Sequence, residues 1–136
     1  MRPIKFRAKD NTTGEWRYGV PVQTNYGISM VQQLWHIDGA EYNANEYMVD
    51  SDTVGEFTGL FDKNGKEVYE GDVIAIDDHM KLGNLSAVII FDDGAFQMRI
   101  TFDYNMHGIL SEDQDRFDAT QDRLNKWKVI SNIYEK

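Results

Sequence analysis

The 136-residue chain is 41% hydrophobic and 12% aromatic, which is typical of a folded globular protein, and its 23 Asp and Glu outnumber 14 Lys and Arg to give a net charge of −9. This acidity repels a phosphate backbone unless the few basic residues gather on one face, so direct nucleic-acid binding is disfavoured. The absence of cysteine excludes disulfides and thiolate sites, and the absence of an apolar run near the roughly 20 residues of a membrane span predicts a cytoplasmic protein without membrane contact.

Strand patterns dominate the first half of the chain. Residues 3–8 predict one strand, the turn cluster 11–14 follows it, and residues 15–20 alternate well enough to pair back as a hairpin. Residues 26–37 are rich in Val, Ile, Trp and Met, which favours one or two further strands but leaves a short helix open. Residues 38–50 have no clean period and predict a connection with about one turn of helix.

The first strand carries the basic cluster of the chain. Alternation places Lys5, Arg7 and Lys9 on one face, which is either an anion or partner patch or the solvated face of an edge strand. Aromatic side chains on the next strand can anchor a partner if they are exposed, or fill a core if they are buried. The candidate partner surface therefore consists of Lys5, Arg7, Lys9, Trp16, Arg17 and Tyr18.

The run TGLFDKNGKEVYEGDVIAI, residues 58–76, carries two turn signals between strand signals. Asn64-Gly65 is the dipeptide that best tolerates positive φ at both central positions of a tight turn, so it predicts a β-hairpin. Glu70-Gly71 then lets the backbone reverse before residues 72–76 begin an apolar strand.

A second hairpin is predicted further along the chain. Residues 87–91 have the pattern of a buried strand, Asp92-Asp93-Gly94 supplies a turn, and residues 95–102 alternate as the returning strand. Residues 111–125 predict a helix or a polar loop, and residues 127–130 resume as a strand. A strand opened by Gly-Asp-Val, then a hairpin, then an aromatic returning strand is the order expected of a small SH3-like barrel.

The sequence therefore predicts a mainly β, α+β fold with at most one or two short helices. We expect an SH3-like small antiparallel barrel with a C-terminal strand over residues 54–136, and a mixed or β-rich N-terminal part over residues 1–53. The two parts can pack as one unit, because 136 residues suit a single domain.

The string VDSDTVGEFTGLFDKNGKEVYEGDVI, residues 49–74, resembles the signature of the YopX family, in which Thr-Val-Gly and Thr-Gly-Leu lead into Asp-x-Asn-Gly-x-x-x-Tyr-x-Gly-Asp. The opening IKFRAKDNTTGEWRYG and the ending VISNIYE, residues 129–135, are also similar to the usual termini of the family. The residues that match the signature, which we interpret as structural, are Thr58, Gly59, Leu60, Asp62, Asn64, Gly65, Tyr69, Gly71 and Asp72.

The resemblance implies a small protein encoded by phages or prophages of bacteria. It also implies a β-rich SH3-like barrel with an N-terminal mixed α/β part, oligomerisation, and no established biochemical activity. Ser131 stands where the family commonly has Gly. A backbone that needs positive φ at this position would be strained by Ser, so the end of the last strand is expected to differ here.

No catalytic, cofactor or metal site is predicted. Asp62, Asn64 and Glu67, with Asp72 further on, offer oxygen ligands but lack the Gly and Glu spacing of a calcium loop. No Ser lies in a nucleophile-elbow context, and no glycine-rich phosphate loop precedes a helix. The histidines are widely separated and without metal-ligand spacing, at His36, His79 and His107.

These observations favour a non-enzymatic accessory protein that acts by protein–protein interaction or self-assembly, with a homo-oligomer expected. One alternative is a nucleic-acid-associated regulator that uses the small barrel and its basic face. Another is an acidic inhibitor that imitates the phosphates of nucleic acid, although a solvated helix face explains the same charges. A third is an enzyme whose residues converge only in the fold. The acidic segment consists of Glu112, Asp113, Asp115, Asp118 and Asp122, interrupted by Arg116.

Overall fold

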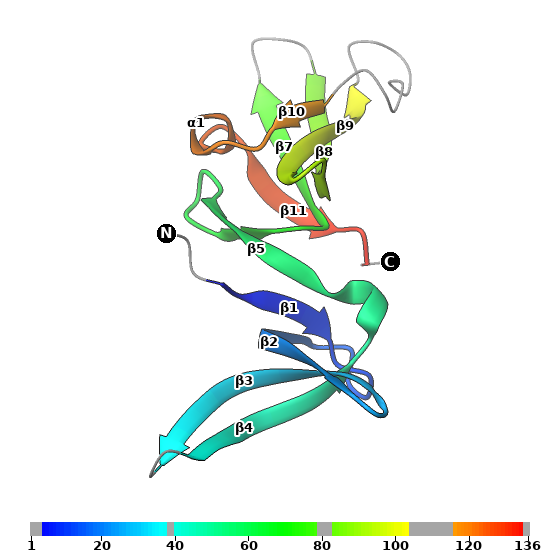
Figure 1. Ribbon diagram of the computed structural model, residues 1–136. Coiled ribbons are helices and arrows are strands. Elements are labelled where there is room, and N and C mark those ends of the chain that lie inside the picture. Colours follow the sequence, from blue (N-terminus) through cyan, green and yellow to red (C-terminus); the bar gives the residue numbers. More distant parts are fainter. Residues whose placement is uncertain (1–3, 38–39, 79–82, 104–115, 135–136) are drawn as a thin grey trace. The chain divides into compact units, whose positions relative to one another are not determined.

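The computed structural model describes residues 4–37, 40–78, 83–103 and 116–134, and the fold is mainly β, as predicted (Figure 1). The chain divides into two compact units, Met1–Phe57 and Thr58–Lys136. Strand β5, Gly55–Phe61, begins in the first unit and ends in the second. Each unit has a hydrophobic cluster of its own.

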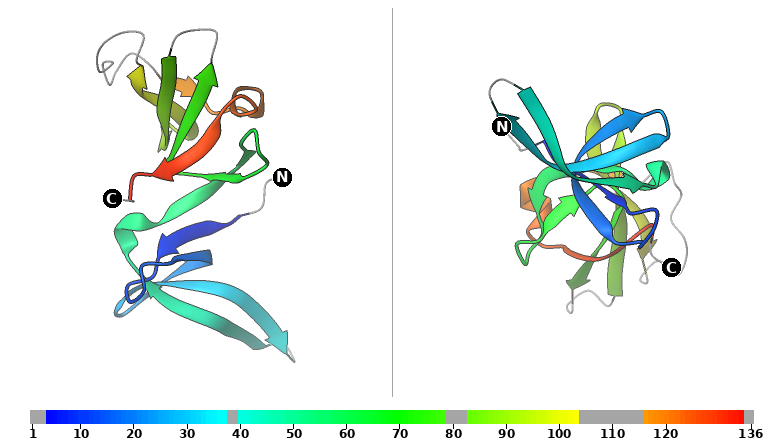
Figure 2. Two further views of the ribbon diagram at one scale, coloured as in Figure 1. Left: turned by 180° about the vertical axis from the view of Figure 1, so that it is seen from behind. Right: turned by 90° about the horizontal axis from the view of Figure 1, so that it is seen from below.

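The first unit is an antiparallel sheet with the strand order β4-β3-β2-β1-β5. Successive strands from β1 to β4 pair as hairpins, and β1 also pairs with the start of β5. β3 and β4 run side by side as a long ribbon, visible in the left view of Figure 2. The elements before β5 are β1 (Phe6–Lys9), β2 (Trp16–Thr24), β3 (Gly27–Ile37), β4 (Ala40–Val49) and the 3-10 turn η1 (Ser51–Thr53).

The prediction of a connection over residues 38–50 is wrong, because residues 40–49 form β4. This strand pairs with β3 along its whole length, from Ala40 opposite Ile37 to Val49 opposite Ile28. Its sequence contains Asn and Glu, which have low strand preference, so the pairing with β3 determines its conformation rather than local propensity. Residues 27–37, for which two strands or a short helix stayed open, form the single strand β3.

The hydrophobic cluster of the first unit lies on one face of its sheet. Ala8, Met30 and Val49 are at most 3% exposed, and they come from β1, β3 and β4 respectively. Strands distant in sequence therefore meet in one apolar cluster, which is what fixes their register. The partly buried side chains that pack against this cluster are Phe6, Ile28 and Val54.

The second unit holds another antiparallel sheet, with the strand order β10-β9-β8-β7-β11. A closed barrel has no edge strands, whereas the described part of this sheet has β10 and β11 at its edges, so closure as an SH3-like barrel is not confirmed. β6 neighbours β5. The elements are β6 (Glu67–Tyr69), β7 (Asp72–Asp78), β8 (Gly83–Asp92), β9 (Ala95–Asp103), β10 (Arg116–Asp118), α1 (Gln121–Leu124) and β11 (Lys128–Asn132).

The segment predicted as a helix or polar loop contains two short elements. β10 pairs with β9, and α1 follows with Thr120 as its N-cap, whose hydroxyl accepts from the Arg123 backbone N–H. Residues 111–115 lie outside the described part of the chain. The core beneath these elements consists of Val68, Ile74, Ala87, Ile89, Phe96, Met98, Ile100, Leu124 and Trp127.

The two predicted hairpin turns differ in backbone conformation. Asp93 and Gly94 both have positive φ, 55° and 79°, and form a two-residue turn between β8 and β9. At Asn64-Gly65 only Gly65 has positive φ, so the expectation for Asn64 is wrong. The Asp62 carboxylate accepts from the Asn64 backbone N–H at 2.8 Å, and this side-chain turn holds Asn64 in an ordinary conformation.

The last strand is irregular beside the residue that departs from the family pattern. The pairing of β11 with β7 shifts register between Val129 and Ser131. Ser131 itself does not have positive φ, so no left-handed strain arises there. The end of the strand thus accommodates Ser131 with an ordinary backbone conformation.

We predict that Gly71→Ala lowers the free energy of unfolding more than Gly65→Ala does. Both glycines have positive φ, 90° and 82°, a conformation that costs a residue with a Cβ about 1–2 kcal/mol. At Gly71 a Cβ would also lie 3.0 Å from Tyr134 Cε2, whereas nothing lies within 4 Å of the same position at Gly65. Denaturant unfolding of the two variants measures the difference, and equal losses would contradict a contribution from Tyr134.

Candidate interaction surface

The register of β1 and β2 brings most of the predicted partner surface onto one face. Arg7 pairs with Tyr18 and Lys9 pairs with Trp16, and alternation adds Lys5 to the same face. The Arg7 guanidinium lies 4.2 Å and the Lys9 ammonium 5.3 Å from the centroid of the Trp16 ring. Arg7 is only 5% exposed, while Tyr18 is 41% exposed. Cation–ring contacts therefore stabilise this part of the face and bury most of Arg7.

Arg17 lies apart from these cations, because it pairs with Ala8 on the face that carries the core. Its Nε donates to Asp10 Oδ2 at 3.0 Å, and its guanidinium lies 3.8 Å from the centroid of the Tyr47 ring. The Glu15 carboxylate lies 3.6 Å from Nη2 of the same guanidinium. The four basic residues invoked for the nucleic-acid alternative, Lys5, Arg7, Lys9 and Arg17, thus do not share one face.

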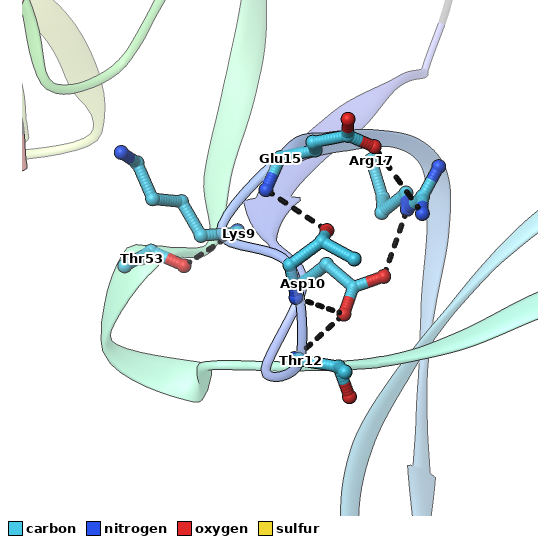
Figure 3. Close-up of polar contacts among 7 residues, drawn as sticks. Lys9, Asp10, Thr12, Glu15, Arg17 and Thr53 are labelled. Atoms are coloured by element: carbon cyan, nitrogen blue, oxygen red, sulfur yellow. Dashed lines mark hydrogen bonds and ion pairs between the residues drawn. The ribbon is translucent and has the colours of Figure 1, made fainter.

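Asp10 organises the turn between β1 and β2 (Figure 3). Its Oδ1 accepts from the backbone N–H groups of Thr12 and Thr13 at 2.7 and 3.2 Å. The hydrogen bond from Thr12 and the one from Arg17 hold the pKa of Asp10 below its usual value, against the opposing effect of burial. Next to it, the Lys9 backbone N–H donates to the Thr53 hydroxyl at 2.9 Å, which attaches η1 to β1.

A set of exposed apolar side chains continues the same face on β2 and β4, with the buried Ser29 of β3 between them. Tyr18, Val20 and Val22 alternate along β2, and the pairs of Val22 with Ser29 and of Ser29 with Met48 extend the face to β4. Their exposed fractions are 41% for Tyr18, 42% for Val20, 38% for Val22 and 37% for Met48. We name Tyr18, Val20, Val22 and Met48 the apolar face.

Three members of the apolar face, Val20, Val22 and Met48, were not among the residues predicted from sequence. The signal was present for β2, because WRYGVPVQT alternates large apolar and other residues. Such alternation normally marks the side turned toward the core. Here the cluster of Ala8, Met30 and Val49 lies on the other face, and although Val31, the β3 partner of Val20, is 2% exposed, Val20 and Val22 are themselves exposed.

In the second unit, the Asp62 carboxylate joins the signature hairpin to the last strand. It is 5% exposed, its Oδ1 accepts from the N–H groups of Asn64 and Lys66 at 2.8 and 2.9 Å, and its Oδ2 accepts from the Val129 N–H at 2.9 Å. Burial opposes ionisation, but these hydrogen bonds and the charge of Lys66 outweigh it and lower the pKa of Asp62. The carboxylate therefore acts as a structural hydrogen-bond acceptor.

The first signature residues connect β5 to β6. The Thr58 hydroxyl donates to the Val68 carbonyl at 2.7 Å and accepts from the Leu60 N–H at 3.1 Å. Gly59 between them has a φ of 81°, a conformation that favours glycine. Leu60 is half-buried against the core of the second unit.

The last signature residues form the reversal into β7. Asp72 is 1% exposed, and its carboxylate accepts from the Tyr69 N–H at 2.8 Å. The Gly71 N–H donates to the Ile89 carbonyl at 2.8 Å, and the Gly71 carbonyl accepts from the Ile133 N–H at 2.9 Å. This reversal therefore contacts both β8 and the chain just after β11.

The signature lies within a longer similarity to one family. A family model described as YopX protein matches residues 5–136. The chain belongs to the YopX family. Among solved structures, the crystal structure of protein EF1440 from Enterococcus faecalis is similar, with a TM-score of 0.62 and 23% identity over 98% of this chain and 95% of that chain. This likeness shows a shared fold. A search of curated proteins finds no match.

The other site predictions for this YopX protein concern metals, acidic residues and membranes. In the described residues, no group of three His, Asp or Glu is placed to hold a metal ion, and no helix is long and apolar enough to span a membrane. Asp118 in β10 and Asp122 in α1 are exposed. The predicted residues that lie outside the described part of the chain are His79, His107, Glu112, Asp113 and Asp115.

We predict that the free energy of unfolding decreases as the pH falls below about 4. The pKa values of Asp10 and Asp62 are lowered in the folded state, so their stabilisation is complete above the unfolded pKa and is lost as the pH falls through the folded pKa. Denaturant unfolding at pH values from about 6 to 2 measures this loss.

We also expect Asp62→Asn to lower the unfolding free energy at neutral pH by about 1–3 kcal/mol, because an amide cannot accept all three N–H groups and its NH₂ would face a donor. The variant should lose less further stability on acidification than the wild type. Asp93→Asn, in an exposed turn where Asn tolerates positive φ, is the control and should match the wild type. If Asp62→Asn retained the acid dependence of the wild type, Asp62 would not be its source.

Proposed function

We propose that this protein is a phage- or prophage-encoded accessory protein that acts without catalysis, by binding protein, including copies of itself, through the apolar face of its first unit. The observation that supports this proposal is the exposure of four large apolar side chains, each between 37% and 42%, on one face of one sheet. Contiguous exposed apolar residues on a soluble domain are typical of protein interaction sites. Tyr and Met are also enriched at interfaces.

The position of these residues opposite the core strengthens the argument. Ala8, Met30 and Val49 form the hydrophobic cluster of the unit on the other face of the sheet. Val20 and Val22 lie on the opposite face, away from that cluster. Covering them with a protein surface removes apolar area from water, which stabilises a complex by about 25 cal/mol per Å² of apolar surface buried.

The ribbon of β3 and β4 favours a second copy of this chain as one binding partner. The pairs between β2 and β3 extend only from Gly27 to Val31, whereas those between β3 and β4 continue to Ile37. The far half of the ribbon is thus two-stranded, and two-stranded ribbons are marginally stable in isolation. β4 also lies at the edge of the sheet order, where backbone groups can pair with another strand.

The alternatives have less support. Burial of Arg7 and the position of Arg17 on the core face weaken the basic surface that a nucleic-acid regulator would use. Imitation of nucleic acid by the acidic segment stays a prediction, since only Asp118 and Asp122 of its acidic residues are described. Closure of the second unit as an SH3-like barrel also stays a prediction.

We predict that Val22→Lys weakens self-association about tenfold or more, because it places a charge at the centre of the apolar face. Light scattering over a range of concentrations should give a wild-type mass that is a multiple of 15.7 kDa, and a mass near 15.7 kDa for the variant at the same concentration. The matched control is Gln23→Lys, which adds the same charge one residue away on the other face of β2. It should associate like the wild type.

A wild-type protein that stays monomeric at all concentrations would contradict self-assembly. Equal effects of Val22→Lys and Gln23→Lys would show that added charge, rather than the apolar face, controls association. Thermal unfolding of both variants separates loss of association from loss of fold.

A further inference from the structure

The second unit contains a cavity of about 360 Å³ that is distinct from the apolar face. Its floor is formed by Met98, Ile100 and Trp127, which are at most 7% exposed and belong to the core. A cavity whose floor consists of packed core residues has a fixed shape, because core side chains hold defined rotamers. Its volume falls in the range of small-molecule sites, roughly 300–1,000 Å³.

An aromatic wall lies beside this floor. Phe117 in β10 lines the cavity and is 44% exposed, so part of its ring is available for contact. The indole of Trp127 lines the same cavity. Aromatic side chains favour planar groups, because ring pairs gain about 0.5–1.5 kcal/mol beyond the area that they bury.

The remaining lining residues in the described part of the chain are charged. They are two cations, Arg123 and Lys126, and one carboxylate, Asp122. The Arg123 Nη1 donates to the Asp118 carbonyl at 2.8 Å, and its guanidinium lies 5.5 Å from the centroid of Phe117. These contacts hold the guanidinium beside the aromatic wall. The described lining therefore carries a net positive charge in a chain of net charge −9.

We propose that this cavity binds a small aromatic anion, with its ring on Met98, Ile100 and Trp127 and its carboxylate or sulfonate near Arg123 and Lys126. An apolar floor with a few convergent polar groups is the usual composition of such a site. Guanidinium and ammonium groups select the anion, since hydrogen bonds to charged groups are stronger than neutral ones. This proposal does not depend on the interaction function of the first unit.

The test compares naphthalene-2-carboxylate with naphthalene-2-carboxamide, which share a ring system and differ in charge. Titration calorimetry gives the affinities, and the indole N–H resonance of Trp127 reports the location of binding. We expect the carboxylate to bind and to shift this resonance, and the amide to bind about five- to tenfold more weakly. Absence of binding by the carboxylate up to its solubility limit, or equal affinity for the two compounds, would overturn the proposal.

Substitutions in the cavity lining test the roles assigned to Arg123, Lys126 and Phe117. Arg123→Gln combined with Lys126→Gln should remove the preference for the carboxylate, and Phe117→Ala should weaken binding of both compounds. The matched control is Arg116→Gln, which removes a cation next to Phe117 in β10. Arg116 forms an ion pair with Asp92 and does not line the cavity. If the double variant kept the preference, or if Arg116→Gln removed it, the assigned cations would be wrong. The wild-type Trp127 shift remains a test should the double variant fail to fold.

Discussion

The fold of the second unit depends on one buried carboxylate that serves two distant segments. Asp62 accepts two N–H groups from its own hairpin and a third from Val129, 67 residues further along the chain. An ionised group can be buried when hydrogen bonds replace its hydration. Because the turn supplies two of these donors, the Asn64-Gly65 conformation and the charge of Asp62 stabilise each other. The match of this stretch to the YopX family thus has a physical reason in the local geometry.

In the first unit, the exposed apolar residues of β2 lie on the face opposite the cluster of Ala8, Met30 and Val49. β2 places its large apolar residues on the exposed side, and Arg17 with its partner Asp10 on the side of the core. The guanidinium is tolerated there because Asp10 and the Tyr47 ring contact it. The same placement leaves Val20 and Val22 exposed on the opposite face.

The sequence predicted the features that depend on local turn chemistry. The hairpin around residues 11–14, the turn at Asp93-Gly94 and the reversal at Gly71 follow from residues that permit those conformations. β4 could not be predicted, because its conformation comes from pairing with β3 rather than from its own composition. Closure into an SH3-like barrel was inferred from strand order and from the family resemblance, and strand order does not determine whether the edges meet.

For the candidate sites too, the sequence predicted what depends on local pattern and not what depends on tertiary pairing. Alternation placed Arg7 and Lys9 on one face, as the register with β2 shows, but the position of Arg17 required that register. The cavity of the second unit brings β9 together with β10 and the residues around α1, which lie further along the sequence. No spacing rule connects Met98 to Trp127, so only the folded chain reveals that they share a floor.

The wide separation of β7 and β11 along the sequence has a consequence for synthesis on the ribosome. Ile74 of β7 is fully buried and pairs with Val129 of β11, which is made much later. A nascent polypeptide cannot complete this side of the sheet until β11 has left the exit tunnel, so β7 lacks this neighbour for an interval after its own synthesis. Newly made chains therefore pass through a short interval in which chaperones or premature aggregation compete with the docking of the last strand.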